Sequence, residues 1–212
     1  FIDRRDAHRE TERERDRAAR AMAPGVVQVA WSMYLARLSS HPVRTKAVTA
    51  AAIQGASDVL AQRLSGCKRI DARRTALFAL FGLAWAGPAL HYWQSFLEAR
   101  FRGRKQSLRL VLEKSLLDQT VYGPVANLAM MAFITLLVEG KRLGDLRDKV
   151  KKQFAAVQLN AYKVWPLASV ANYSLVPPQL RVLFMNGMGL AWSTFLILSA
   201  QGKARGGKKK EA

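Results

Sequence analysis

Cysteine is almost absent from the chain, and its scarcity excludes whole classes of site. The 212 residues contain one cysteine, Cys67, so neither a disulfide framework nor a multi-cysteine metal site can form. Histidine is nearly as rare, because His8, His41 and His91 are the only three and none has a second His, Cys or acid at a metal-ligand spacing. We therefore expect no bound metal and no cofactor.

Signatures of catalysis are missing as well. No nucleophile elbow is present, and the C-terminal GKARGGKKK has the wrong order for a phosphate loop and no strand before it. The alternation of apolar and polar residues that is typical of β-strands is not found either. The sequence thus predicts an all-α protein that is not an enzyme.

Acidic residues are scarce too, and the basic residues are unevenly placed. The chain has 34 Lys and Arg against 15 Asp and Glu, a net charge of +19, while half of its residues are hydrophobic. The bases cluster in short segments between apolar runs, as in membrane proteins, so we expect anionic lipids as partners and not nucleic acid. We expect a charged N-terminal arm at 1–24, a helical membrane domain at 25–200 and a basic tail at 201–212.

Long uncharged runs predict the membrane spans. Residues 75–97, 119–138 and 182–202 carry no formal charge, and each is long enough to cross a hydrocarbon core of about 30 Å as a helix. A fourth helix is expected at 43–64, with a polar stripe of Gln54, Asp58 and Gln62 on the face toward other helices. The fold prediction is therefore an integral membrane bundle of about four transmembrane helices.

Shorter segments predict additional helices beside the bundle. Residues 21–36 read as an interfacial helix that ends at His41-Pro42. The run 164–180 contains Pro166, Pro177 and Pro178, which predict a broken or partly embedded helix. Between Leu146 and Ala161 the apolar residues recur at helical spacing, which indicates a basic amphipathic helix that lies either on an anionic membrane surface or on the bundle itself.

Two acids, Asp58 and Asp118, are expected within or at the edge of the membrane, where a carboxylate needs a partner or water. One interpretation makes them part of a polar pathway. In the other, Asp118 is the N-cap of the third span and Asp58 pairs with a base such as Arg74 or Lys114. The candidate pore or buried polar residues are Asp58, Gln62, Asp118, Gln119, Asn127 and Asn172; the candidate contacts to anionic lipid are Arg73, Arg74, Arg100, Lys149, Lys151 and Lys152.

Close helix contacts are expected where small residues recur four apart. Gly82 with Ala86 and Gly187 with Ala191 have this spacing, which lets helices approach closely.

Several short motifs, in order, carry a resemblance to a known family. WSMYLARLSSHPVRTKAVT, ASDVLAQ, GPALHYWQSFL, LLDQTVYGPV, KVWPLASVANYSLVPPQLR and AWSTFLILS lie between about Trp31 and Ser199. Together they resemble the Mpv-seventeen / 22-kDa peroxisomal membrane protein family. The chain departs from the family pattern at Ser57, where Gly is usual, and at Gln94, Ser169 and Tyr173, where Tyr, Gln and Phe are usual.

The resemblance implies a small all-helical protein of peroxisomal or mitochondrial inner membranes, with a weakly selective channel or a role in metabolite homeostasis as the expected function. Because the chain begins with Phe1, removal of a presequence would favour the mitochondrial inner membrane, or a plastid, over a peroxisome. The alternative hypothesis is a lipid-binding accessory subunit of a larger respiratory or photosynthetic membrane complex, suggested by the charged arm, the basic tail and the interfacial helix.

Overall fold

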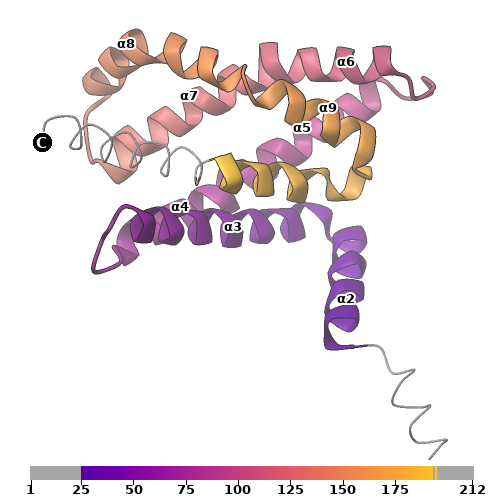
Figure 1. Cartoon of the computed structure of the whole chain (residues 1–212), viewed down its shortest axis with the longest axis horizontal. Helices are drawn as coiled ribbons and strands as arrows, with labels where there is room; N and C mark the ends of the chain where they lie inside the picture. Colours follow the sequence, from indigo (N-terminus) through magenta and orange to yellow (C-terminus); the bar gives the residue numbers. More distant parts are fainter. Residues whose placement is uncertain (1–24, 193, 195–212) are drawn as a thin grey trace, which may run out of the picture. The chain divides into compact units, whose positions relative to one another are not determined.

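The computed structural model describes residues 25–192 and residue 194, and all regular secondary structure in that part of the chain is helical (Figure 1). The all-α prediction is therefore confirmed for these residues. They fall into two units, one ending at Ser40 and one beginning at His41, a boundary that lies inside the region 25–200 predicted as one membrane domain. The predicted arm at 1–24 and tail at 201–212 lie outside the described residues.

The first unit contributes one described helix, α2 (Val26–Ser40), where the interfacial helix was expected. Its aromatic residues Trp31 and Tyr34 stack with ring centroids 5.5 Å apart. The chain then enters α3 (Pro42–Leu64), which starts on a proline. Proline suits the first turn of a helix because its missing N–H would have no partner there.

In the second unit, α3 packs closely against a long continuous helix made of α4 (Ala72–Phe81), η1 (Gly82–Ala86) and α5 (Gly87–Arg100). Two glycines allow the contact. A Cβ atom on Gly82 would lie 2.6 Å from the Ala50 carbonyl oxygen, and one on Gly87 would lie 2.6 Å from Ala47 Cα. The second predicted pair of small residues is Gly187 with Ala191. A Cβ atom added to Gly187 would meet nothing within 4 Å among the described residues. Close packing at that pair is therefore not seen.

A second continuous helix consists of α6 (Leu108–Leu117), η2 (Asp118–Tyr122), α7 (Gly123–Phe133) and η3 (Ile134–Val138). Among the described residues, this helix, Leu108–Val138, is the one long and apolar enough to be a candidate membrane span. It begins eleven residues before the uncharged run 119–138, because the charged residues of α6 are accommodated within the helix. The other predicted spans stay predictions, and part of 182–202 lies outside the described residues.

Each of the two long helices contains a wide π-helical turn directly before a Gly-Pro pair. The Gly87 N–H donates to the Gly82 carbonyl and the Gly123 N–H to the Asp118 carbonyl, five residues back in each case. Pro88 and Pro124 follow, and a proline ring clashes with the carbonyl four residues before it. The wider turn accommodates the proline without ending the helix, and such turns are frequent at functional sites.

The chain then makes a further pass along the second long helix. It consists of α8 (Leu143–Ala161) packed on α7 and α9 (Trp165–Leu175) packed on α6, so it runs antiparallel to Leu108–Val138 (Figure 1). The predicted amphipathic helix is thus present as α8, and it packs against the bundle. Pro166 lies in the first turn of α9. Pro177 is extended and Pro178 begins the 3-10 turn η4 (Pro178–Leu180), after which residues 181–192 are helical.

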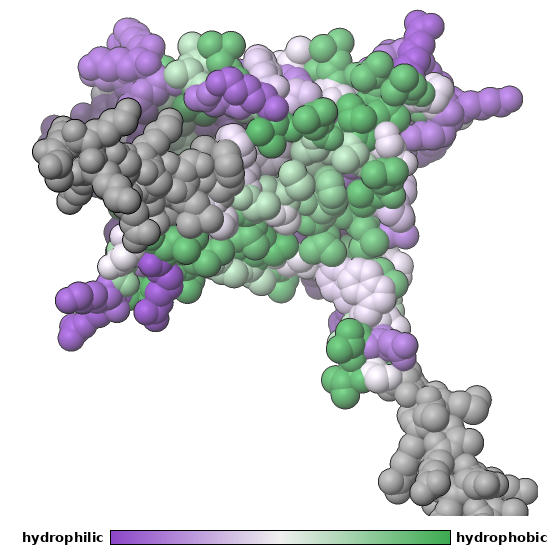
Figure 2. All heavy atoms as spheres, viewed as in Figure 1, coloured by the Kyte–Doolittle hydropathy of each residue, from purple (hydrophilic) through white to green (hydrophobic). Residues whose placement is uncertain are grey.

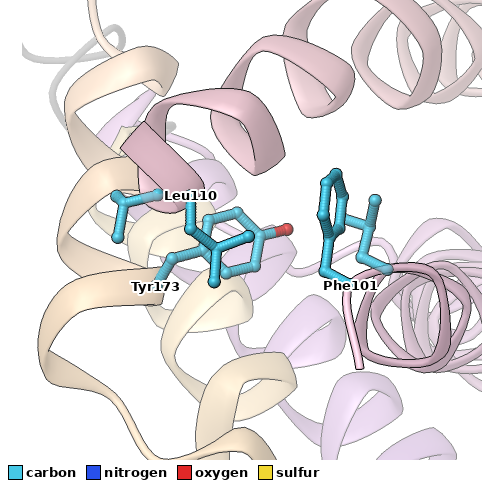
Figure 3. Close-up of a cluster of buried hydrophobic side chains, with 5 residues drawn as sticks. Phe101, Leu110 and Tyr173 are labelled. Atoms are coloured by element: carbon cyan, nitrogen blue, oxygen red, sulfur yellow. The ribbon is translucent and has the colours of Figure 1, made fainter. Parts of the chain in front are cut away.

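The apolar core of the second unit lies where α5, α6 and α9 meet. Figure 3 shows Phe101, Leu110 and Tyr173 converging from these three segments, and Leu97 and Val111 complete the cluster. Large hydrophobic side chains are nevertheless also exposed on the outside. In the view of Figure 2 they cover the middle of the unit, while hydrophilic residues gather toward its edges. This distribution is typical of a helical bundle surrounded by lipid.

Candidate functional site

The interior of the second unit is unusually polar. From His41 onward, the described residues bury as many polar or charged side chains as hydrophobic ones. Polar groups in a dry interior need hydrogen-bond partners, so each of these residues requires an explanation. The buried polar and charged residues are Lys46, Asp58, Gln62, Gln94, Lys114, Ser115, Asp118, Thr135, Gln158, Ser169, Asn172, Arg181 and Asn186.

Asp118 is the centre of one polar cluster, and its carboxylate is held by three neutral donors. Trp93 Nε1 donates to Oδ1 over 2.6 Å, Tyr173 Oη donates to the same oxygen over 2.8 Å, and Ser169 Oγ donates to Oδ2 over 2.7 Å. Gln119 Nε2 in turn donates to Ser169 Oγ over 3.3 Å. The cluster therefore links α5, η2 and α9.

The prediction of Asp118 as a helix N-cap is wrong. Its backbone is α-helical, with φ −56° and ψ −47°, and it begins η2 in the middle of a continuous helix. The nearest N-cap is Ser107, whose hydroxyl accepts from the Leu110 N–H over 3.3 Å. Asp118 is the first residue of the π-helical turn that precedes Gly123-Pro124. The distortion that accommodates the proline therefore begins at this carboxylate.

Two buried amides on the helices that supply this cluster's donors make no hydrogen bond of ordinary geometry in the described part of the chain. Asn172 is fully buried on α9, beside Tyr173, and both ends of its amide are unpaired. Gln94 on α5 is 4% exposed, and its amide reaches the Tyr173 hydroxyl without a hydrogen bond of ordinary geometry. Leaving a buried polar group unpaired costs about 1–3 kcal/mol. Water or a polar solute beside these amides would remove that cost.

Asp58 lies in a second cluster, formed by the end of α3 and the start of α4. Arg74 Nε lies 2.8 Å from Asp58 Oδ1, while Gln62 Nε2 and Thr75 Oγ1 donate to Oδ2 over 2.7 and 2.8 Å. Gln62 Oε1 also accepts from the Asp71 N–H over 2.7 Å. Asp58 therefore pairs with Arg74, one of the two bases considered for it, and Lys114 pairs elsewhere.

A basic cavity of about 650 Å³ opens between the α5–α6 loop and the turn that follows α9. At its wall Glu98 accepts a hydrogen bond from Lys114 Nζ over 2.6 Å and another from Arg181 Nη1. Gln94 also lines this cavity, so one of the unpaired amides faces it. Tyr173 connects the cavity wall to the Asp118 cluster, because its ring lies 5.1 Å from the guanidinium of the cavity residue Arg181 and its hydroxyl donates to Asp118.

The other predicted polar residues lie farther along the second long helix. Asn127 Nδ2 donates to Gln158 Oε1 of α8 over 2.8 Å, which ties α7 to α8. Gln119 is half-buried and bonds Ser169. The structure thus joins Asp118 and Gln119 in one cluster, with Asn172 beside it, places Asp58 and Gln62 in another, and leaves Asn127 in a separate contact.

The residues predicted to contact lipid divide into paired and exposed ones. Arg74 pairs with Asp58, Arg73 Nη2 donates to the Leu137 carbonyl over 3.4 Å, and Lys149 Nζ donates to Glu139 over 3.0 Å. Hydrogen bonds from Lys141 and Lys149 hold the pKa of Glu139 below its ordinary value. Four residues of the predicted set are exposed, namely Arg73, Arg100, Lys151 and Lys152.

Sequence reasoning did not select Trp93, Ser169 and Tyr173, which donate to Asp118, or Lys46 and Arg181 at the cavity. A signal was available, however. Three of the four positions that depart from the family pattern, Gln94, Ser169 and Tyr173, lie at or beside the Asp118 cluster. Of these, Tyr173 adds a hydrogen-bonding group where the family usually has Phe, whereas the usual Tyr and Gln at positions 94 and 169 are polar as well.

Comparison with known proteins gives consistent matches. The Mpv17 / PMP22 family model matches residues 136–197. Peroxisomal membrane protein PMP22 of Arabidopsis thaliana is 35% identical over 168 residues, 79% of this chain and 88% of the relative. PXMP2/4 family protein 2 of Dictyostelium discoideum is 34% identical over 173 residues, 78% and 88% of the two chains. Mitochondrial inner membrane protein Mpv17 of Drosophila melanogaster is 30% identical over 154 residues, 71% and 91%. No solved structure matches the chain significantly.

The described part of the chain is helical, with one helix long and apolar enough to be a candidate span and with large hydrophobic side chains exposed, and the relatives are named for organelle membranes. The chain is therefore an organelle membrane protein. The chain belongs to the Mpv17 / PMP22 family, so the resemblance seen in its motifs is confirmed. The relatives' names include both the peroxisomal membrane and the mitochondrial inner membrane.

Proposed function

We propose that the protein forms a weakly selective pathway for small polar solutes across an organelle membrane. Four helices would cross the bilayer, namely α3, the helix 72–100, the helix 108–138 and the helix that begins at residue 181. The α8–α9 pass would pack against them and supply Ser169, Asn172 and Tyr173 to the interior. The proposal assigns no catalytic step to any residue.

The observation that carries this proposal is the unpaired polar interior. Gln94 and Asn172 are buried with unsatisfied amides, in a unit whose outer surface exposes large hydrophobic side chains. A lipid environment offers no hydrogen bonds, so polar side chains that face the interior of a bundle indicate a solute or water path. Asp118 bonds Ser169 and Tyr173 of the same helix as Asn172, and it would bind water molecules along the same path.

The proposal is tested by solute release from liposomes that contain the purified protein. Asn172→Leu keeps the branching and the number of side-chain heavy atoms but removes both unpaired polar atoms. We expect the variant to fold at least as stably as the wild type, because no hydrogen bond is lost, and to release a small neutral solute several-fold more slowly.

Asn160→Leu serves as the matched control. Asn160 lies at the exposed end of α8, where its side chain accepts one hydrogen bond from Lys163. Release by this variant should equal that of the wild type. Equal release by Asn172→Leu at equal folded yield, or no release by the wild type above empty liposomes, would contradict the proposal.

A further inference from the structure

The basic cavity contains more positive charge than its own residues neutralise. Its walls include three buried cationic residues, Lys46, Lys114 and Arg181, which are 7%, 5% and 6% exposed. Glu98 is the one acid that lines it, and it is already shared between Lys114 and Arg181. The three buried cations therefore exceed this carboxylate by two charges, and the exposed Arg102 and Arg104 also line the cavity.

Lys46 is the clearest case of an uncompensated cation. Its ammonium lies 3.1 Å from His91 Nδ1, and an imidazole that accepts this hydrogen bond adds no negative charge. The ammonium has three N–H groups, so two remain for another acceptor. Burying an unmatched cation is costly, and an anion bound in the cavity would offset that cost.

The donors are also fixed in position before any anion arrives. Arg181 Nε donates to the Val176 carbonyl over 3.1 Å, and its guanidinium lies over the Tyr173 ring. Lys114 Nζ lies 5.6 Å from the centre of the same ring. These contacts hold the two cations at one wall of the cavity, while Gln94 supplies an unpaired amide. A site held in this way loses little side-chain entropy on binding.

We propose that this cavity binds the phosphate group of a small anionic solute. Two unmatched charges fit a phosphate dianion better than a monovalent carboxylate, and ammonium, guanidinium and amide donors are those that bind phosphate oxygens. The inference rests on the proposed function, because it names the class of solute that would occupy the mouth of the pathway. The same chemistry would also accept a lipid phosphate headgroup.

The test is equilibrium binding of radiolabelled inorganic phosphate to the purified full chain in a maltoside detergent, which contains no phosphate. The wild type should bind phosphate saturably. Gln94→Glu should weaken binding by at least about tenfold, because it puts a negative charge at the cavity wall in nearly the same shape. Arg181→Gln, which removes one donor, should weaken it as well.

Gln153→Glu is the control, since it makes the same change of charge at an exposed site on α8. Phosphate binding by this variant should match the wild type. Absence of saturable binding by the wild type, or equal binding by folded Gln94→Glu, would overturn the inference.

Competition then identifies the source of the phosphate. Displacement by a water-soluble phosphate monoester, and not by a short-chain phosphatidate, indicates a free solute; the reverse indicates a lipid headgroup, and both results support a phosphate site. Solute release from liposomes without phosphate binding would overturn the proposed phosphate site and leave the proposed pathway standing. Phosphate binding without liposome release would leave the site standing and overturn the pathway.

Discussion

At the scale of single residues, the polar interior depends on how each buried group is satisfied. Asp118 has three neutral donors, whereas Asp58 has a cation and two donors. Asp118 is therefore held by hydrogen bonds alone, without a contacting base. That arrangement places an acidic side chain inside the bundle with no cation in contact, where a pathway can use it.

The contribution of the Tyr173 hydroxyl to stability can be measured by removing it. Tyr173→Phe deletes the hydroxyl that donates to Asp118 over 2.8 Å and leaves the ring in the apolar core. We expect a loss of about 1–3 kcal/mol in the free energy of unfolding, since a charged acceptor loses one of its donors. Denaturant unfolding in detergent, followed by tryptophan fluorescence, measures it.

Tyr92→Phe is the matched control, because Tyr92 is 63% exposed on the same helix as Trp93. It should leave the unfolding free energy within about 0.5 kcal/mol of the wild type. Equal stability of the two variants would show that the Tyr173 hydroxyl contributes nothing to holding Asp118.

At the scale of elements, the sequence predicted the helices better than their ends. In the part of the chain that the structure describes, uncharged runs and apolar spacing indicated the long helices, since those patterns are what membrane and core packing require. The positions of charged residues did not mark the helix ends, however. Arg109 and Glu113 pair four residues apart on α6, and Lys114 bonds Glu98, so the helix continues through them to Leu108. Such pairs depend on neighbouring turns and helices, which a count of charges does not show.

The site was harder to predict than the fold for the same reason. Asp58 and Asp118 stood out because acids are rare in apolar runs. Their donors Thr75, Trp93 and Tyr173 come from other helices, and only the three-dimensional packing brings them within 3 Å. The π-helical turns at Asp118 and Gly82 were likewise not predicted, although a Gly-Pro pair inside a long apolar run is a usable sign of them.

Helix contact at Gly87 gives a prediction at this scale. Gly87→Ala places a Cβ atom 2.6 Å from Ala47 Cα and 3.0 Å from the Lys46 carbonyl oxygen, both backbone atoms that cannot move alone. We expect α3 and α5 to separate, with a loss of about 1–3 kcal/mol in unfolding free energy. Thermal unfolding in detergent measures the effect.

Gly144→Ala makes the same chemical change where there is room. A Cβ atom there meets nothing within 4 Å, and the residue lies in the first turn of α8. This variant should be as stable as the wild type or slightly more stable, because alanine favours a helix over glycine. Equal effects of the two substitutions would contradict a close contact at Gly87.

At the scale of the whole molecule, the second unit is a bundle that exposes large hydrophobic side chains and buries polar and hydrophobic side chains in equal number. Basic residues lie at both of its ends, at Arg73 and Arg74 beside the α3–α4 loop and at Arg100 and Arg102 beside the α5–α6 loop. A helix that joins these two ends must cross the membrane if the bundle spans it. The helix 72–100 joins them.

Labelling with a membrane-impermeant maleimide tests this topology, and the single native cysteine makes it simple. Cys67 is exposed in the α3–α4 loop, and Lys105 is exposed in the α5–α6 loop. In oriented organelles, the wild type and a Cys67→Ser, Lys105→Cys variant should be labelled from opposite sides of the membrane. Labelling of both from one side would show that the helix between them does not cross.

The most direct test of the central claim is conductance of the purified protein in planar bilayers. Asp118→Asn keeps the shape of the buried carboxylate but removes its charge, and Asp148→Asn makes the same change at an exposed site on α8. We predict that Asp118→Asn changes the conductance or the cation-to-anion permeability ratio by at least about twofold, since it removes the negative charge at the centre of the path. Asp148→Asn should behave as the wild type. If Asp118→Asn also conducts as the wild type at equal folded yield, the polar interior is not a solute pathway.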